Sequence, residues 1–247
     1  MDCPDCERID DIIFPETTIW FWPPTEDSHH KMLGLLNSDE YTAVGFGERG
    51  LRLTLPSSQI KALGLILMGA LENEELRGLK IATTPRAELG PDDLGRFSTG
   101  AAFVARIESE WLIDALRAER FESWLQPIVT TDGAPFAHEA LFRIREKDGS
   151  IIGPQRAFDV ASEGQLLFNL DLVSRRSAVQ TAAKARLPGK LFINFNPSSI
   201  YDPAYCLRTT ASVVQDIGLK PQDIVFEVTE SDQARDLRHL KGILAFY

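Results

Sequence analysis

The pattern of apolar and polar positions over the first hundred residues favours a small α+β arrangement. The run at 17–22 is β-branched and aromatic and stops at Pro23-Pro24, as a short strand does. Runs at 41–46 and 51–55 flank the turn sequence 47–50, and leucines alternate with polar residues in the second run. These two runs predict a β-hairpin.

A helix and then a linker are predicted after the hairpin. Ser57 and Ser58 offer N-caps for an apolar helix over 59–75. Residues 82–100 carry prolines and glycines between polar residues, which is typical of a linker. We therefore expect an N-terminal α+β module over 1–100, with a regulatory role, and a second domain over 108–247.

Beyond this boundary, strand-like and helical periods alternate. The predicted strands lie at 124–129, 136–144, 191–195 and 224–228. The predicted helices lie at 108–120, from 154, at 167–185, at 203–217 and from 233. Strands separated by such helices indicate an α/β fold of βα units with a parallel sheet, open or closed into a barrel. The turn at 131–134 also allows the first two strands to be antiparallel neighbours.

Composition and charge narrow the class of protein. With 247 residues, 44% of them hydrophobic, the chain can bury a sizeable core. Its formal charge of −10 disfavours long nucleic acid as a partner. The longest uncharged apolar run, 62–71, is about half as long as a transmembrane helix needs to be. We therefore expect no membrane segment in this chain.

The three cysteines and the acidic N-terminus indicate a reducing compartment. No basic segment followed by an apolar stretch opens the chain, so no secretory signal is predicted and a cytoplasmic location is expected. Cys3 and Cys6 have the spacing of a zinc or redox pair, which His29 and His30 would complete. A CxxC at a chain terminus is more often incidental.

Polar side chains interrupt three of the apolar strands. In the strand at 136–144, the two-residue period puts Glu139, Leu141 and Arg143 on one face. The polar residues within or directly after the later strands are Asn194, Asn196, Glu227 and Glu230. Active sites of α/β folds lie at C-terminal strand ends. These oxygen donors therefore indicate a site for a hard divalent cation such as Mg²⁺ or Mn²⁺ rather than Zn²⁺.

Each of these residues also has a simpler structural explanation. A single polar residue in a strand is more often hydrogen-bonded within the protein or exposed at a sheet edge. By the same reasoning, Arg175-Arg176 is expected to be a solvated pair on its helix, and Trp20, Phe21 and Trp22 to belong to a core. The pattern alone leaves a shared metal site and separate structural roles both open.

From about Phe121 onward, the chain resembles the EAL domain family, the bacterial phosphodiesterases of cyclic di-GMP. The matching segments, in the family's order, are Gln126-Pro127-Ile128, Glu139-Ala140-Leu141-Phe142-Arg143, Pro154 with Phe158, Ile193-Asn194 and Phe226-Glu227-Val228-Thr229-Glu230-Ser231. The resemblance implies a TIM-like βα barrel and hydrolysis of cyclic di-GMP to linear pGpG with Mg²⁺ or Mn²⁺.

The resemblance also implies roles for individual residues. Glu139, Asn194 and Glu227 would be metal ligands. Glu139 and Glu230 would serve catalysis, with Glu230 ordering a loop that carries later acidic ligands. The residues that would bind the substrate are Gln126, Leu141, Arg143 and Asp171. Arg143 would hold a phosphate oxygen by a charge-assisted bond.

The chain departs from the family pattern at its end. EAL domains continue into a strand with an Asp-Asp-Phe-Gly-like segment, a lysine and a further glutamate, whereas this sequence stops at Phe246-Tyr247. We therefore expect the first half of an EAL domain, taken from a longer protein and inactive alone. A receptor for cyclic di-GMP or a partner-docking domain is the alternative, and a homodimer is a family-based expectation.

Overall fold

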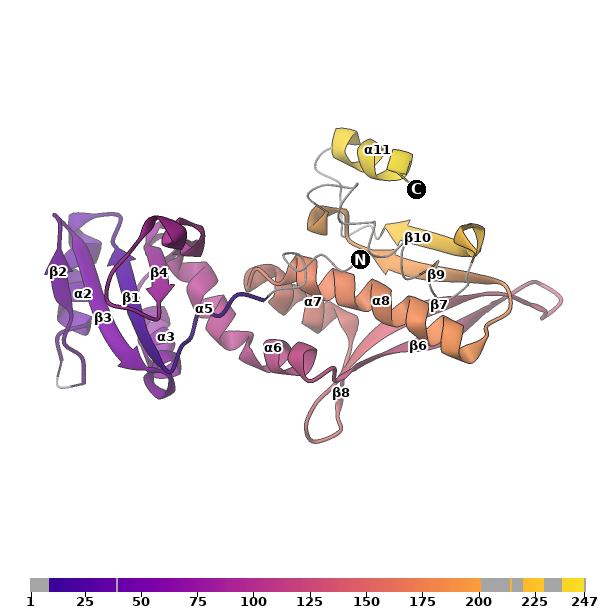
Figure 1. Ribbon diagram of the computed structural model, residues 1–247, viewed down its shortest axis with the longest axis horizontal. Coiled ribbons are helices and arrows are strands. Elements are labelled where there is room, and N and C mark those ends of the chain that lie inside the picture. Colours follow the sequence, from indigo (N-terminus) through magenta and orange to yellow (C-terminus); the bar gives the residue numbers. More distant parts are fainter. Residues whose placement is uncertain (1–8, 39, 201–213, 215–219, 229–236, 247) are drawn as a thin grey trace. The chain divides into compact units, whose positions relative to one another are not determined.

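The computed structural model describes residues 9–38, 40–200, 214, 220–228 and 237–246. The chain divides into two compact units, and each contains its own sheet (Figure 1). The N-terminal unit comprises residues 10–110 and 163–165, and the C-terminal unit comprises residues 1–9, 111–162 and 166–247.

The N-terminal unit contains a five-stranded antiparallel sheet. Its strands are β1 (Glu16–Trp22), β2 (Val44–Phe46), β3 (Gly50–Pro56), β4 (Lys80–Thr84) and β5 (Ser98–Thr99). They lie in the order β2-β3-β1-β4-β5, so β1 is the central strand. The strand predicted at 17–22 and the predicted hairpin are both confirmed.

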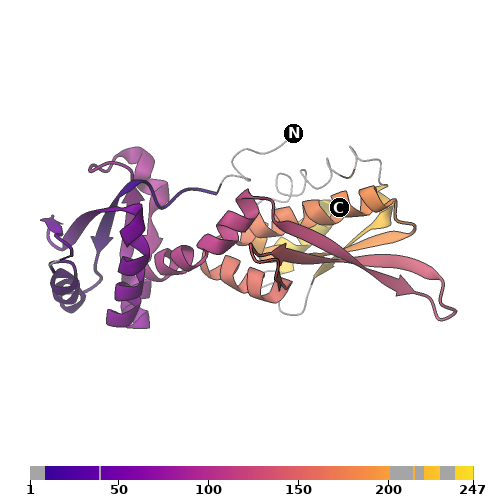
Figure 2. The same cartoon turned by 90° about the horizontal axis from the view of Figure 1, so that it is seen from below.

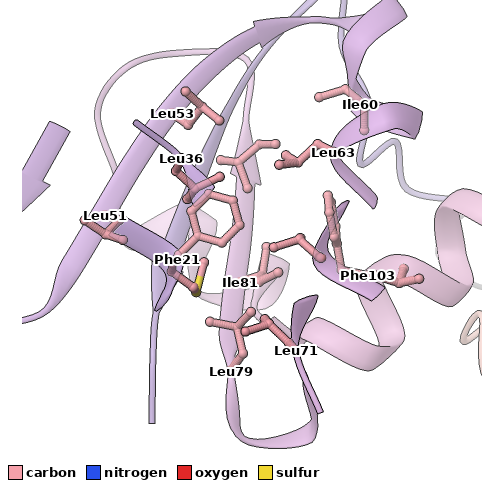
Figure 3. Close-up of a cluster of buried hydrophobic side chains, with 14 of the residues drawn as sticks. Phe21, Leu36, Leu51, Leu53, Ile60, Leu63, Leu71, Leu79, Ile81 and Phe103 are labelled. Atoms are coloured by element: carbon pink, nitrogen blue, oxygen red, sulfur yellow. The ribbon is translucent and has the colours of Figure 1, made fainter. Parts of the chain in front are cut away.

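Helices pack on one face of this sheet. They are α2 (Glu26–Leu35), α3 (Ser57–Ala70), α4 (Asn73–Gly78) and α5 (Gly100–Glu108). In β1, Ile19 and Phe21 are fully buried in the core shared with these helices, whereas Trp20 and Trp22 contact Phe46 on the opposite face. Figure 3 shows residues of this core, among them Phe21, Leu36, Leu51, Leu53, Ile60, Leu63, Ile81 and Phe103.

The segment predicted as a linker, 82–100, belongs to the N-terminal unit. It holds the end of β4, the 3-10 helix η1 (Pro91–Arg96) and β5, and the boundary between the units follows Glu110. The carboxylate of Asp93 is 2% exposed and accepts hydrogen bonds from Arg86 Nη2 and the backbone nitrogen of Gly90. These bonds order a loop whose composition resembles that of a linker.

Two helices of this unit also differ from the prediction. The helix expected at 59–75 is interrupted at Leu71, which is extended and buried, and a new helix follows with a capping box between Glu72 and Glu75. Helix α2 has no counterpart among the predicted elements. It begins where the side chain of Thr25 accepts a hydrogen bond from the backbone nitrogen of Ser28.

The C-terminal unit contains the α/β sheet predicted for the second half of the chain. Its strands are β6 (Phe121–Val129), β7 (Pro135–Arg145), β8 (Ile151–Ile152), β9 (Lys190–Phe195) and β10 (Ile224–Val228). Four of them lie in the order β10-β9-β7-β6, and β8 pairs with β7. β6 and β7 are antiparallel, as the turn between them allows, whereas β7, β9 and β10 are parallel.

Helices pack on one face of this sheet too. They are α6 (Glu110–Arg117), α7 (Pro154–Glu163), α8 (Leu167–Ala185) and α11 (Leu237–Phe246), with short 3-10 helices η2 (Pro197–Ser199) and η3 (Pro221–Asp223). Figures 1 and 2 show α8 running along the sheet, where Ala178 and Val179 pack against Ala140 and Ile193. Among the described helices, none is long and apolar enough to cross a membrane.

The other predicted helices of this half agree in part. The helix at 167–185 is confirmed as α8, and α7 begins at Pro154 as predicted. The helix expected over 108–120 is split at Ser109, which ends α5 before α6 starts. The helix predicted at 203–217 lies outside the described residues apart from Val214, and so does the start of the last predicted helix.

Candidate active site

The C-terminal sheet has one face that packs against helices and one that carries polar side chains. Ala140, Phe142 and Ile193 are buried on the helix-covered face. Because side chains alternate along a strand, their neighbours point to the other face. We call this second face the polar face. Its side chains include Gln126, Glu139, Leu141, Arg143, Asn194 and Glu227.

Three parallel strands each place one oxygen-bearing side chain on the polar face. Glu139 comes from β7, Asn194 from β9 and Glu227 from β10. The Nδ2 atom of Asn194 donates a hydrogen bond to Oε1 of Glu139 at 2.8 Å. Glu227 is directly opposite Asn194 in the register of β9 and β10. The structure thus gathers the three predicted ligands on adjacent strands.

The two carboxylates of this group affect each other electrostatically. Burial raises the pKa of the Glu227 carboxyl above its ordinary value, and the negative charge of Glu139 raises it further. Both causes penalise the ionised form of Glu227. A bound cation would offset this penalty, because it favours the charged form of every carboxylate near it.

The donor set is of the kind that hard divalent cations prefer. Mg²⁺ binds through one or two carboxylates while keeping several waters, and amide oxygens are further hard ligands. Among the described residues, no group of three or more His, Cys, Asp or Glu side chains is placed to hold a metal ion. Glu139, Asn194 and Glu227 differ from such a group because one of the three predicted ligands is an amide.

Arg143 lies further along β7 on the same face. Its guanidinium lies over the ring of Trp124, 5.0 Å from the ring centre, and its Nη1 donates to the backbone oxygen of Phe142 at 2.8 Å. The side chain is half-buried, and its remaining donors can bind an anion such as a phosphate.

Gln126 and Leu141 lie beside Glu139 on the polar face. Gln126 is exposed and lies opposite Glu139 in the antiparallel register of β6 and β7. Leu141 is half-buried and lines a cavity of about 400 Å³ beside the middle of β7 and the C-terminal end of β9. Further residues of its wall are Phe142, Gln155, Phe158, Asp171, Asn194 and Asn196.

Asp171, at the start of α8, is fully buried and accepts several hydrogen bonds from the protein. Its Oδ1 accepts from the backbone nitrogen of Asn196, and its Oδ2 accepts from Ser199 Oγ at 2.8 Å and from Arg175 Nε at 3.0 Å. Arg175 is also fully buried, so the expectation of a solvated Arg175-Arg176 pair is wrong for this residue. Asp171 thereby ties the turn after β9 to α8.

Asn196 lines the same cavity as Asn194, and its side chain also has a capping role. Asn196 shares a face with Asn194 in the sequence pattern, but its side chain accepts a hydrogen bond from the backbone nitrogen of Ser198 and caps η2. Glu230 and the pair Cys3 and Cys6 lie outside the described residues.

Sequence comparison assigns this half of the chain to a family. A family model described as the EAL domain matches residues 109–246. The chain belongs to the EAL family. The Glu-Ala-Leu triplet of this family is Glu139-Ala140-Leu141 in the middle of β7, and the C-terminal unit has the α/β fold of the family. No curated protein was found to match the chain.

Solved EAL structures are similar to this chain over part of its length. The FimX EAL domain from Xanthomonas citri in complex with c-di-GMP is 21% identical, with a TM-score of 0.50, over 57% of this chain and 56% of that chain. The FimX EAL domain from Pseudomonas aeruginosa bound to c-di-GMP is 24% identical, with a TM-score of 0.46, over 54% and 53%. A standalone EAL protein from Vibrio cholerae O395, also bound to c-di-GMP, is 33% identical, with a TM-score of 0.43, over 51% and 52%. The chain thus spans about half the length of the EAL structures that it matches.

Three residues near the predicted site residues were not singled out by the sequence analysis. They are Trp124, Arg175 and Ser199. The spacing of Asp171 and Arg175, four residues apart on one helix, does signal an ion pair. The alternation of Trp124 with Gln126 in one strand signals a shared face. No local pattern points to Ser199, because it meets Asp171 through the turn after β9.

Proposed function

We propose that the full-length protein binds cyclic di-GMP on the polar face and hydrolyses it to linear pGpG with Mg²⁺ or Mn²⁺. The observation that carries this proposal is the contact between Asn194 and Glu139, with Glu227 beside them on the next strand. Membership of the EAL family supports the substrate class. A cytoplasmic location, a homodimer and a regulatory N-terminal unit belong to the same proposal.

In this proposal, Glu139, Asn194 and Glu227 hold the divalent cation. A cation bound there would supply Lewis-acid activation of water at neutral pH. The hydrogen bond from Asn194 fixes one oxygen of Glu139, so the carboxylate is oriented before the ion arrives. The pKa of the Glu227 carboxyl is raised, and a cation bound beside it would stabilise its charged form. Glu230 is proposed to support these ligands, as the family resemblance implies.

The substrate would be held by the residues that flank the metal ligands. Arg143 would donate to a phosphate oxygen, Gln126 would offer its amide, and Leu141 would contribute apolar surface at the cavity wall. Asp171 has no exposed surface, and both of its oxygens are engaged by protein donors. We therefore assign Asp171 a positioning role, in which it holds the turn that follows Asn194.

A single assay with paired variants tests this function. Full-length protein is incubated with cyclic di-GMP and Mg²⁺, and pGpG is measured by chromatography. Glu139→Gln is expected to abolish turnover, whereas Glu163→Gln, at an exposed position of α7, is expected to leave it unchanged. Mn²⁺ binding to the protein alone, measured by calorimetry, is expected to weaken in Glu139→Gln and in Glu227→Gln.

The outcomes separate the enzyme from its alternative. Binding of cyclic di-GMP without turnover, with Glu139→Gln indistinguishable from the wild type, would identify a receptor or docking domain instead. No binding of cyclic di-GMP to the full-length protein would overturn the proposal altogether.

A further inference from the structure

A tryptophan lies half-exposed beside the phosphate-binding candidate on the polar face. Trp124 lies directly opposite Leu141 in the register of β6 and β7, and the residue is 48% exposed. The guanidinium of Arg143 covers one side of the indole ring, 5.0 Å from its centre. Because a flat ring has two sides, Arg143 leaves the other side of the indole for a further contact.

The indole is fixed in its orientation by a second set of contacts. Its Nε1 donates to Oε1 of Glu122 at 2.8 Å, and Arg145 Nη2 donates to the same oxygen at 2.7 Å. Glu122 therefore binds the edge of the ring while Arg143 covers its face. A ring held at two points loses little further freedom when a ligand packs against it.

We propose that Trp124 stacks against a guanine base of the bound dinucleotide. The inference rests on the proposed function, since it assigns a base-binding residue to the same site. Arg143 would hold a phosphate, and the adjacent ring would then lie within reach of the base attached to that nucleotide. Aromatic side chains bind bases in this way because every base offers a flat π surface, and Arg beside the ring adds a cation–π contact.

A purely structural role for Trp124 predicts a different result. In that case the ring acts only by holding Arg143, and its loss has no effect once the guanidinium is also removed. Direct stacking on the base predicts that the loss of the ring weakens binding with or without Arg143. The two explanations are thus separated by a double-mutant cycle.

The test measures the affinity of the full-length protein for cyclic di-GMP by calorimetry, with EDTA present so that no turnover occurs. Trp124→Leu is expected to weaken binding by roughly ten- to a hundredfold, and Trp124→Phe by much less, because Phe retains a ring. Trp111→Leu is the matched control: Trp111 also has an arginine, Arg156, over its ring at 5.7 Å, but it lies on α6. This control is expected to keep the wild-type affinity.

A second measurement covers the case in which Trp124→Leu fails to fold. Stacking of guanine on indole quenches tryptophan fluorescence, so the wild type is expected to lose fluorescence on addition of cyclic di-GMP. The quench should persist in Trp111→Phe and disappear in Trp124→Phe.

Three outcomes would each overturn the stacking role. They are unchanged affinity in Trp124→Leu, a quench retained in Trp124→Phe, and an effect of Trp124→Leu that vanishes in an Arg143→Met background. If the wild type binds no cyclic di-GMP, the proposed function fails first and this inference fails with it.

Discussion

Asn194 donates a hydrogen bond from its side-chain nitrogen to Oε1 of Glu139, joining two parallel strands at 2.8 Å on the polar face of the sheet. The bond has two consequences. It fixes the orientation of a carboxylate that would otherwise be free to rotate, and it sets which atom of the amide faces that carboxylate. Glu227, opposite Asn194 on the next strand, adds a second negative charge to the group.

The first prediction concerns the effect of the negative charge of Glu227 on the stability of the folded protein. The pKa of Glu227 is raised by burial and then by Glu139, so the folded protein binds this proton more tightly than the unfolded chain. The free energy of unfolding therefore falls as pH rises from the ordinary glutamate pKa through the raised one. Without metal, Glu227→Gln is expected to melt at a higher temperature than the wild type at pH 7, and at the same temperature at acid pH, where Glu227 is protonated in both states.

Metal is expected to reverse the order of the two melting temperatures. Addition of Mn²⁺ is expected to raise the melting temperature of the wild type, because the ion binds only the folded state, and to raise that of Glu227→Gln much less. Glu163→Gln serves as the control and should follow the wild type under every condition. A Glu227→Gln variant that melts below the wild type in EDTA at neutral pH would contradict the prediction.

A second prediction addresses the buried network at the start of α8. Arg175 and Asp171 are both fully buried, and removal of one partner of such a pair leaves an uncompensated charge. Arg175→Met is expected to lower the free energy of unfolding by about 3–5 kcal/mol, whereas Ser199→Ala should cost about 1–3 kcal/mol by removing one donor to Asp171. Both values are measured by urea denaturation.

The expected order, in which Arg175→Met destabilises the protein more than Ser199→Ala does, tests the role of the ion pair. Exposed Lys184→Met, also on α8, is the control and should change stability by about 0.5 kcal/mol or less. Equal stabilities of Arg175→Met and Lys184→Met would show that the ion pair between Arg175 and Asp171 does not hold the turn after β9.

A third prediction concerns a carboxylate whose pKa moves in the opposite direction. In the N-terminal unit, Glu75 accepts hydrogen bonds from the backbone nitrogen of Glu72 and from the side chains of Lys31 and Ser28. The bond from Glu72, followed by the bond from Lys31, lowers its pKa. The stability contributed by Glu75 is therefore present above the ordinary glutamate pKa and is lost as pH falls through the lowered one.

The measurement is a comparison of melting temperatures over pH. Glu75→Gln is expected to be less stable than the wild type at neutral pH and to approach it at acid pH. Glu74→Gln, the adjacent position in the same helix, is the control and should show no such convergence. A constant difference between Glu75→Gln and the wild type at every pH would mean that the ionised carboxylate is not the stabilising form.

The sequence predicts which residues share a face better than it predicts which residues meet. The two-residue period of a strand is enough to place Glu139, Leu141 and Arg143 together. The contact between Glu139 and Asn194 depends instead on the register of β7 and β9, which are separated by α7 and α8. That register is set by tertiary packing, so no local pattern contains it.

The segment at 82–100, which composition predicts to be a linker, shows the same limit of sequence-based prediction. Its prolines and glycines are typical of a flexible linker, yet buried Asp93 binds Arg86 and orders the segment within the N-terminal unit. Composition reports the backbone angles that a segment can adopt. Whether one conformation is selected depends on a long-range or buried contact that composition does not record.

The last prediction concerns the start of β9, where the register of the site begins. Gly189 has φ of +82°, and a Cβ added there would collide with the backbone oxygen of Phe136 at the start of β7. Gly189→Ala is therefore strained twice, once in its backbone conformation and once by contact, and should lower the free energy of unfolding by more than about 1 kcal/mol. Gly153→Ala is the matched control, because its Cβ would enter open space and its φ is not positive.

The same substitution should also affect metal binding, because β9 places Asn194 next to Glu139. Gly189→Ala is expected to weaken Mn²⁺ binding, measured by calorimetry, whereas Gly153→Ala is not. Wild-type Mn²⁺ affinity in a destabilised Gly189→Ala protein would show that the metal ligands do not depend on the close approach of β7 and β9 at this point.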